Sequence, residues 1–186
     1  MGTGTSISPV RNVVAIAPRV HDWTSLFAAT TGWTVLGTDT VNLTTDLSHV
    51  LGTKSLEFDK TDGVANTKLA AVYRAVVWNL AGVKAEDRIV GNFFIPNKVD
   101  VDYAFVRLGT SVGAMNEWRY QDTSMIDASW NRLNVAVGDF TQTGAGIDWS
   151  SVLYLSVGVA FDAETDALAD IYWNSVGIEQ APLMRT

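Results

Sequence analysis

Glu57 and Asp59, in the stretch EFDKTD, are the residues whose types and spacing best fit a catalytic pair. Alternate residues of a β-strand point to the same side, so the two carboxylates would share one face. Carboxylates about 5 Å apart serve as nucleophile and general acid in retaining glycoside hydrolysis. However, the third acid of the stretch, Asp62, belongs to a TDG turn and does not lie in line on the strand. In addition, Leu56 and Phe58 occupy the phase that faces a core. We therefore predict that Glu57 and Asp59 form a solvated strand face and that the protein is not an enzyme.

Metal and nucleophile signatures are weak elsewhere in the sequence. The two histidines, His21 and His49, stand in unrelated contexts with no partner at metal-ligand spacing. The zinc motif His-Glu-x-x-His does not occur, and there is no cysteine to act as a nucleophile. The stretch LGTKS lacks the Gly-Lys order of a phosphate-binding loop, and we interpret it as a turn that leads into a strand.

Aromatic and arginine side chains gather in two expected strands, 101–108 and 116–121. If these strands are neighbours, they form a platform on which a sugar ring stacks, or a patch that meets another protein. The side chains of this candidate surface are Tyr103, Phe105, Arg107, Trp118, Arg119 and Tyr120. The alternative is that this face is packed and the opposite face is solvated.

The elements that must position these residues are β-strands, because two-residue periodicity recurs along the chain and a sustained helical period does not. Turn residues separate the strands, as in TDG, IPN, LGTSVG and TGAG. The expected strands are 33–36, 55–59, 71–78, 88–95, 101–108, 116–121, 131–137, 152–161 and 168–178.

Alternation also predicts the core. The stretch DWSSVLYLSVGVAF is the clearest example, and one of its faces is entirely apolar. The predicted core residues are Leu56, Phe58, Leu133, Val135, Val137, Leu153, Leu155, Val157, Val159 and Phe161. Trp130 and Trp173 are also expected inside. In the last strand, a β-bulge near Asn174 and Ser175 would bring all of its apolar residues to the core.

The overall composition excludes several classes of protein. The chain has 186 residues and a net charge of −7, and its 13 lysines and arginines are scattered, so nucleic acid is not expected as a direct partner. No apolar run has the length of a membrane span, and the N-terminal sequence lacks the features of a signal peptide. We therefore expect one folded domain, made in the cytoplasm, without a membrane partner.

Five stretches, taken in order, resemble the jelly-roll β-sandwiches of carbohydrate-binding modules and of many tailed-phage virion proteins. They are LGTKSLEFD (51–59), RLGT (107–110), SWNRLNVAVGDF (129–140), GIDWSSVLYLSVGV (146–159) and IYWNSVGIE (171–179). The resemblance implies an all-β fold, an antiparallel jelly-roll β-sandwich. It implies a fold more strongly than an activity, because such sandwiches serve many functions.

Many modules of this kind carry a structural calcium ion. If the first and last strands lie side by side, as the resemblance implies, Asp22, Asp170 and Asn174 offer the oxygen ligands that calcium takes. However, Asn174 and Ser175 stand where the family has paired acids. Calcium at this site is the one cofactor that we consider, and otherwise none is expected.

The resemblance leaves two functions open. An acidic, cysteine-free jelly roll with an extended N-terminus favours a phage capsid decoration protein, which binds the major capsid protein on the outside of the head and stabilises it. Such a protein would be located in the virion after synthesis in the host cytoplasm. The alternative is a carbohydrate-binding module or fibre domain that recognises a glycan.

The expected domain organisation is an N-terminal arm at 1–20, a sandwich at 21–180 and a C-terminal tail at 181–186. The arm segment RNVVAIAP is apolar and β-branched, and it could add as a strand to a neighbouring sheet. Its contacts would be made by Val13, Val14 and Ile16. Because several weak contacts around a threefold axis strengthen one another, a homotrimer is expected.

Overall fold

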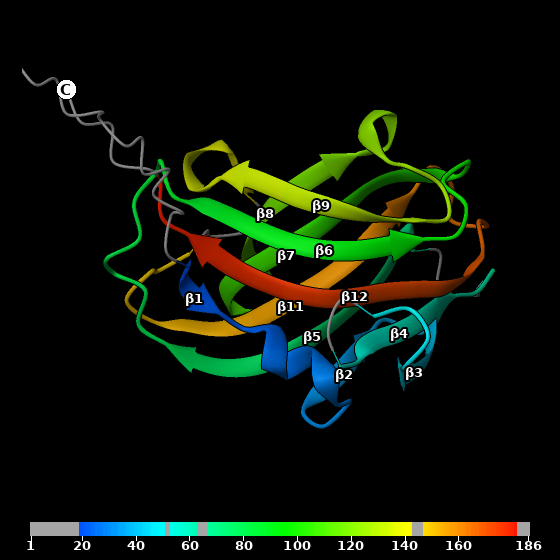
Figure 1. The fold of residues 1–186 in the computed structure, drawn as a ribbon, viewed down its shortest axis with the longest axis horizontal. Helices are drawn as coiled ribbons and strands as arrows, with labels where there is room; N and C mark the ends of the chain where they lie inside the picture. The colour runs from blue at the N-terminus through cyan, green and yellow to red at the C-terminus, as the bar shows by residue number, and fades with distance from the viewer. Residues whose placement is uncertain (1–18, 51–52, 63–66, 143–146, 182–186) are drawn as a thin grey trace, which may run out of the picture.

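Two antiparallel sheets packed face to face form the protein, as the computed structural model shows for residues 19–50, 53–62, 67–142 and 147–181 (Figure 1). The front sheet of Figure 1 has the order β3-β4-β12-β6-β9, and β1 pairs with β12. The back sheet has the order β10-β8-β7-β11-β5-β2. The expected antiparallel jelly-roll β-sandwich is therefore confirmed.

The front strands are β1 (Arg19–Asp22), β3 (Thr40–Asp46), β4 (Ser55–Lys60), β6 (Arg88–Ile95), β9 (Ser129–Ala136) and β12 (Leu168–Glu179). The back strands are β2 (Trp33–Leu36), β5 (Leu69–Trp78), β7 (Val101–Ser111), β8 (Ala114–Gln121), β10 (Thr141–Gln142) and β11 (Val152–Phe161). Short 3₁₀ helices lie at Thr24–Ala28, Asp122–Ser124 and Val137–Asp139. Among the described residues, no helix is long and apolar enough to cross a membrane.

The predicted strands β2, β6 and β11 have the observed bounds, whereas β1, β3 and β10 were not predicted. The sequence of β3, TVNLTTD, is largely polar because it lies at the edge of the front sheet and buries few side chains. The predicted arm contacts Val13, Val14 and Ile16 lie outside the described residues.

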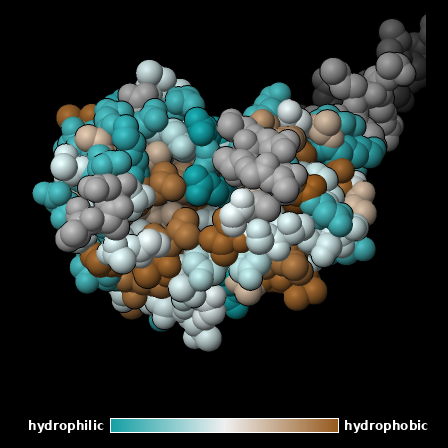
Figure 2. Space-filling view, turned by 180° about the vertical axis from the view of Figure 1, so that it is seen from behind, coloured by the Kyte–Doolittle hydropathy of each residue, from teal (hydrophilic) through white to brown (hydrophobic). Residues whose placement is uncertain are grey.

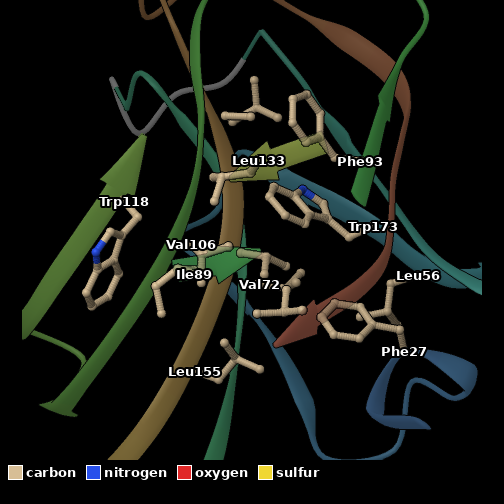
Figure 3. Close-up of a cluster of buried hydrophobic side chains, with 14 of the residues drawn as sticks. Phe27, Leu56, Val72, Ile89, Phe93, Val106, Trp118, Leu133, Leu155 and Trp173 are labelled. Atoms are coloured by element: carbon tan, nitrogen blue, oxygen red, sulfur yellow. The ribbon is translucent and has the colours of Figure 1, made fainter. Parts of the chain in front are cut away.

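The core fills the space between the two sheets. Side chains from both sheets, among them Trp173 of the front sheet and Leu155 of the back sheet, point toward one another (Figure 3). Eight of the ten predicted core residues are buried: Leu56, Phe58, Leu133, Val137, Leu155, Val157, Val159 and Phe161. Trp173 is fully buried as well.

Three core predictions need correction. Leu153 is 36% exposed, because a register shift between Val152 and Tyr154 gives the buried position to Val152 instead. Val135 packs against the core, but it is only half-buried. Trp130 is also half-buried, and it contacts Phe94 on the outer face of the front sheet, because it lies in the opposite strand phase to Leu133.

The irregularity predicted in the last strand is present. The register between β12 and β6 shifts between Trp173 and Ser175. As a result Ile171 and Val176, on either side of the shift, are both buried. Strand β1 pairs with β12, so the first and last described strands lie side by side as expected.

Candidate functional site

The outer face of the back sheet carries a compact group of charged and aromatic side chains from two paired strands. On β7, Phe105 lies opposite Arg119 of β8, and Arg107 lies opposite Glu117. Tyr103 is the next residue of β7 in the same phase. Because side chains alternate along a strand, these five share one face of the sheet. We call them the arginine–aromatic cluster.

Glu117 is the centre of this cluster. One carboxylate oxygen accepts a hydrogen bond from Arg107 Nε at 2.5 Å, and the other accepts one from Arg119 Nε at 2.7 Å. The Glu117 side chain is fully buried, whereas Arg107 is 14% exposed and Arg119 is 34% exposed. The two guanidinium groups therefore lie on the solvent side of the carboxylate that holds them.

Each guanidinium also lies over an aromatic ring. Arg107 Cζ is 4.1 Å from the centroid of the Phe105 ring, and Arg119 Cζ is 4.0 Å from that of Tyr103. Both separations are within the range of a cation–π interaction. The hydrogen bonds to Glu117 and the contacts with the rings together fix the orientation of both arginines.

The surroundings of Tyr103 and Arg119 raise the pKa values of both side chains. Burial raises the pKa of the Tyr103 phenol, and the nearby Glu117 carboxylate raises it further, so Tyr103 stays neutral. Burial alone would lower the pKa of Arg119, but the hydrogen bond and charge of Glu117 raise it above its ordinary value. At neutral pH Tyr103 is therefore neutral and Arg119 is positively charged.

Small residues beneath the cluster let the Phe105 ring lie close to the sheet. Phe105 is opposite Gly158 of β11, which pairs on its other side with Ala71 of β5. A Cβ atom at position 158 would lie 2.7 Å from the tip of the Phe105 ring and 2.4 Å from the backbone oxygen of Ala70. Only glycine fits at this position.

Replacing Gly158 by alanine should lower the free energy of unfolding by about 1–3 kcal/mol, because the added methyl overpacks a central strand. It should also displace Phe105 and, with it, Arg107. In the control Gly82→Ala the methyl meets nothing within 4 Å, so the change should stay within about 0.5 kcal/mol. Urea unfolding measures both variants, and equal effects would contradict the close approach at Gly158.

Two tyrosines continue this face toward β5. Tyr73 lies opposite Ser156 of β11, which lies opposite Arg107 on its other side. The half-buried rings of Tyr73 and Tyr154 are 6.1 Å apart. Between them and the cluster, the buried Ser156 hydroxyl donates to the backbone oxygen of Val72 at 2.9 Å.

Figure 2 shows this side of the molecule, with hydrophobic and strongly hydrophilic side chains next to one another around a central hollow. Such a surface offers apolar rings and fixed donors to the same ligand.

The structure brings together four of the six residues of the predicted surface: Tyr103, Phe105, Arg107 and Arg119. Trp118 and Tyr120 are the exceptions, because alternation along β8 directs them to the core. Trp118 is fully buried and donates from Nε1 to the backbone oxygen of Val137 at 3.2 Å. The Tyr120 ring packs against Phe93 in the core.

Sequence reasoning missed Glu117, Tyr73 and Tyr154. Strand phase could have found the first, because Glu117 and Arg119 are two residues apart and share a face of β8. Tyr154 lies within the stretch whose alternation is clearest, in the phase opposite to the core. The pairing of β5 with β11 brings Tyr73 to it.

A second group of side chains lies on the outer face of the front sheet. Glu57 and Asp59 point away from the core, as predicted, while Leu56 and Phe58 are buried. Carboxylate oxygens of Glu57, Asp59 and Asp170 lie within 4.8 Å of one another. The third acid of this group is Asp170 of β12, and not Asp62 of the TDG turn. Burial raises the pKa of Glu57, and the neighbouring carboxylates raise it further.

The predicted calcium ligands do not meet. Asp22 lies opposite Gly177, seven residues beyond Asp170 along β12, and accepts hydrogen bonds from Thr24. The buried Asn174 amide donates to the backbone oxygen of Lys54 at 2.8 Å. Asp170 instead belongs to the acidic group with Glu57 and Asp59, and its backbone N–H donates to Asp59 at 2.9 Å.

Aromatic rings lie beside these acids. The His49 ring stacks on Tyr172 at 4.5 Å, Phe94 lies 5.6 Å from Tyr172, and Trp130 lies 6.0 Å from Phe94. We call these four residues the front aromatic row. Tyr172 is buried, and Phe94 and Trp130 are half-buried.

The prediction that the protein is not an enzyme overlooked one motif of hydrolytic enzymes. GTSVG, at 109–113, has the Gly-x-Ser-x-Gly spacing of a nucleophile elbow. That motif requires a strand followed by a helix. Here it spans the turn between β7 and β8, two strands of a hairpin, so the turn does not present Ser111 as a nucleophile elbow would.

No protein-family model and no curated protein matches the chain. Solved structures do match. The family 11 carbohydrate-binding module of the cellulosomal cellulase Lic26A-Cel5E of Clostridium thermocellum has a TM-score of 0.58 at 12% identity, covering 91% of this chain and 98% of the module.

Two further structures show the same likeness. A protein from work on the promiscuous specificity of carbohydrate-binding modules of the β-sandwich superfamily gives a TM-score of 0.54 at 13% identity, covering 80% of this chain and 57% of the other. An exo-β-agarase has a TM-score of 0.61 at 8% identity, and the match covers 88% of this chain but 25% of the enzyme. The chain thus has the fold of carbohydrate-binding modules, and at these identities the likeness shows the fold alone.

Proposed function

We propose that this protein binds a glycan without catalysis, on the outer face of the back sheet. The observation that carries the proposal is the buried Glu117 carboxylate, which holds two guanidinium groups on an outer sheet face. Hydrophobic residues of similar size usually stabilise a protein as well as a buried ionic network does. Departures from the simplest packing are expected at functional sites. The carbohydrate-binding modules of the same fold support a glycan as the ligand.

The tyrosines and the arginines of this face would contact different groups of the glycan. The rings of Tyr73 and Tyr154 offer apolar surfaces for the C–H face of a sugar, with hydroxyls at their rims. Arg107 and Arg119 offer charge-assisted donors at fixed positions. Because Glu117 holds both arginines before the ligand arrives, little side-chain entropy is lost on binding.

Capsid decoration, the function that the sequence favoured, receives no support from the comparisons. The structures described above are carbohydrate-binding modules or an enzyme that contains such a fold, and none is a virion protein. The major capsid protein as partner, the homotrimer and the location in the virion stay predictions. A fibre domain that recognises a glycan would agree with the function proposed here.

The proposal is tested by affinity electrophoresis through gels that contain neutral or acidic polysaccharides. The wild-type protein should be retarded by at least one of them. The double variant Tyr73→Ala/Tyr154→Ala should weaken binding at least about tenfold, a loss of about 1.4 kcal/mol. Trp130→Ala, on the front aromatic row, is the matched control and should bind normally. Binding that is lost only in Trp130→Ala would place the site on the front sheet, and no retardation in any gel would contradict the proposal.

A further inference from the structure

We infer that the glycan recognised at the arginine–aromatic cluster is anionic and bears carboxylate or sulfate groups. This inference rests on the proposed function and adds the chemical class of the ligand. It follows from how the cluster presents its rings, its donors and its charge.

The ring faces of the cluster are already occupied. Phe105 is fully buried and Tyr103 is 8% exposed, and a guanidinium group lies over each of them. Arg107 and Arg119 are more exposed than the rings beneath them. A neutral sugar therefore cannot stack on these two rings unless it displaces an arginine that Glu117 holds in place.

The guanidinium groups still have donors to offer. Each donates to Glu117 through Nε. Among the described residues, the terminal Nη atoms of Arg107 and Arg119 form no hydrogen bond. Two Nη atoms of one guanidinium form a planar fork that matches two oxygens of a carboxylate or a sulfate. A single sugar hydroxyl cannot fill such a fork.

The charge of the cluster points the same way. Two guanidinium groups against one carboxylate leave a surplus of one positive charge, although the whole chain carries −7. The charge of Asp102 also raises the pKa of Arg119, but Asp102 is exposed and lies outside the hydrogen-bonded group. An anionic group on the ligand would compensate the surplus, whereas a neutral hydroxyl would not.

The experiment is isothermal titration of the whole chain with three soluble polymers: polygalacturonate, dextran sulfate and a neutral β-glucan. We expect at least one anionic polymer to bind at least tenfold more tightly than the β-glucan. Arg119→Gln should weaken that binding at least tenfold, and Arg119→Lys should weaken it as well, because lysine keeps the charge but lacks the fork. Thermal unfolding of each variant verifies that it is folded. The two anionic polymers distinguish carboxylate from sulfate as the preferred group.

Arg132→Gln is the matched control, because it removes one positive charge from the front sheet, where Arg132 pairs with Glu179. Equal weakening by Arg132→Gln and Arg119→Gln would show nonspecific charge attraction and overturn the inference. Tighter binding of the β-glucan would overturn it too, while leaving the proposed function intact. Binding of none of the polymers, together with no retardation in any gel, would overturn both.

Discussion

Replacing Glu117 by alanine should lower the free energy of unfolding by about 3 kcal/mol, the lower end of the range for breaking a buried ion pair. The change leaves Arg107 and Arg119 without the carboxylate that accepts both of their Nε hydrogen bonds. Part of the cost is relieved because Arg119 is 34% exposed and can turn toward water. Urea unfolding, followed by tryptophan fluorescence, measures the loss.

Glu117→Gln separates charge from shape at the same position. The amide oxygen can still accept one Nε hydrogen bond, so this variant should lose less stability than Glu117→Ala. Glu117→Ala should lose glycan binding, because the guanidinium groups are no longer held over Tyr103 and Phe105. Glu117→Gln should weaken binding less, because it still holds one of them. A Glu117→Ala protein with wild-type stability and binding would show that the carboxylate does not organise the cluster.

Replacing Lys60 by alanine should cost more, about 3–5 kcal/mol of unfolding free energy, because both partners of its ion pair are buried. Lys60 Nζ lies 3.6 Å from a carboxylate oxygen of Asp39, and the two side chains are 0% and 1% exposed. The same Nζ donates to the backbone oxygens of Thr61 at 3.0 Å and Glu164 at 2.9 Å. Lys60 thus links the end of β4 to the loop between β11 and β12, and its removal leaves Asp39 as an uncompensated buried charge.

Two comparisons test the role of Lys60. Lys68→Ala removes an exposed lysine that also donates to a backbone oxygen, that of Asp162, and should cost less than about 1 kcal/mol. The double variant Lys60→Met/Asp39→Asn removes both charges, so it should be more stable than Lys60→Met alone. Calorimetric melting of these proteins gives the ranking. A double variant that is the less stable of the two would contradict the ion pair as the source of the cost.

The sandwich could be predicted because its long strands alternate so regularly. Leu155, Val157 and Val159 are buried as alternation requires. The errors lie where local geometry interrupts the pattern. Leu153 loses its core position to a register shift, which depends on how β11 pairs with β5. Pairing is a property of two strands, and one sequence segment does not reveal it.

The candidate site was predictable to the extent that it lies within single strands. Tyr103, Phe105 and Arg107 share a face of β7 by alternation alone. Trp118 was misplaced because its aromatic character was given more weight than its phase, although Arg119 beside it lies in the other phase. The role of Glu117 depends on the β7–β8 register, which sets it opposite Arg107. Likewise, Asp170 joins Glu57 only through the pairing of β12 with β4.

Chemical-shift mapping tests the central claim most directly. The isotope-labelled protein would be titrated with an oligosaccharide prepared from the polysaccharide that retards it most. The account predicts that the backbone amides of β7, β8 and β11 around Arg107 and Arg119 shift in proportion to occupancy, while those of β6 and β9 stay unchanged. Shifts centred on Phe94 and Trp130 of the front sheet, with none on β7 and β8, would contradict it.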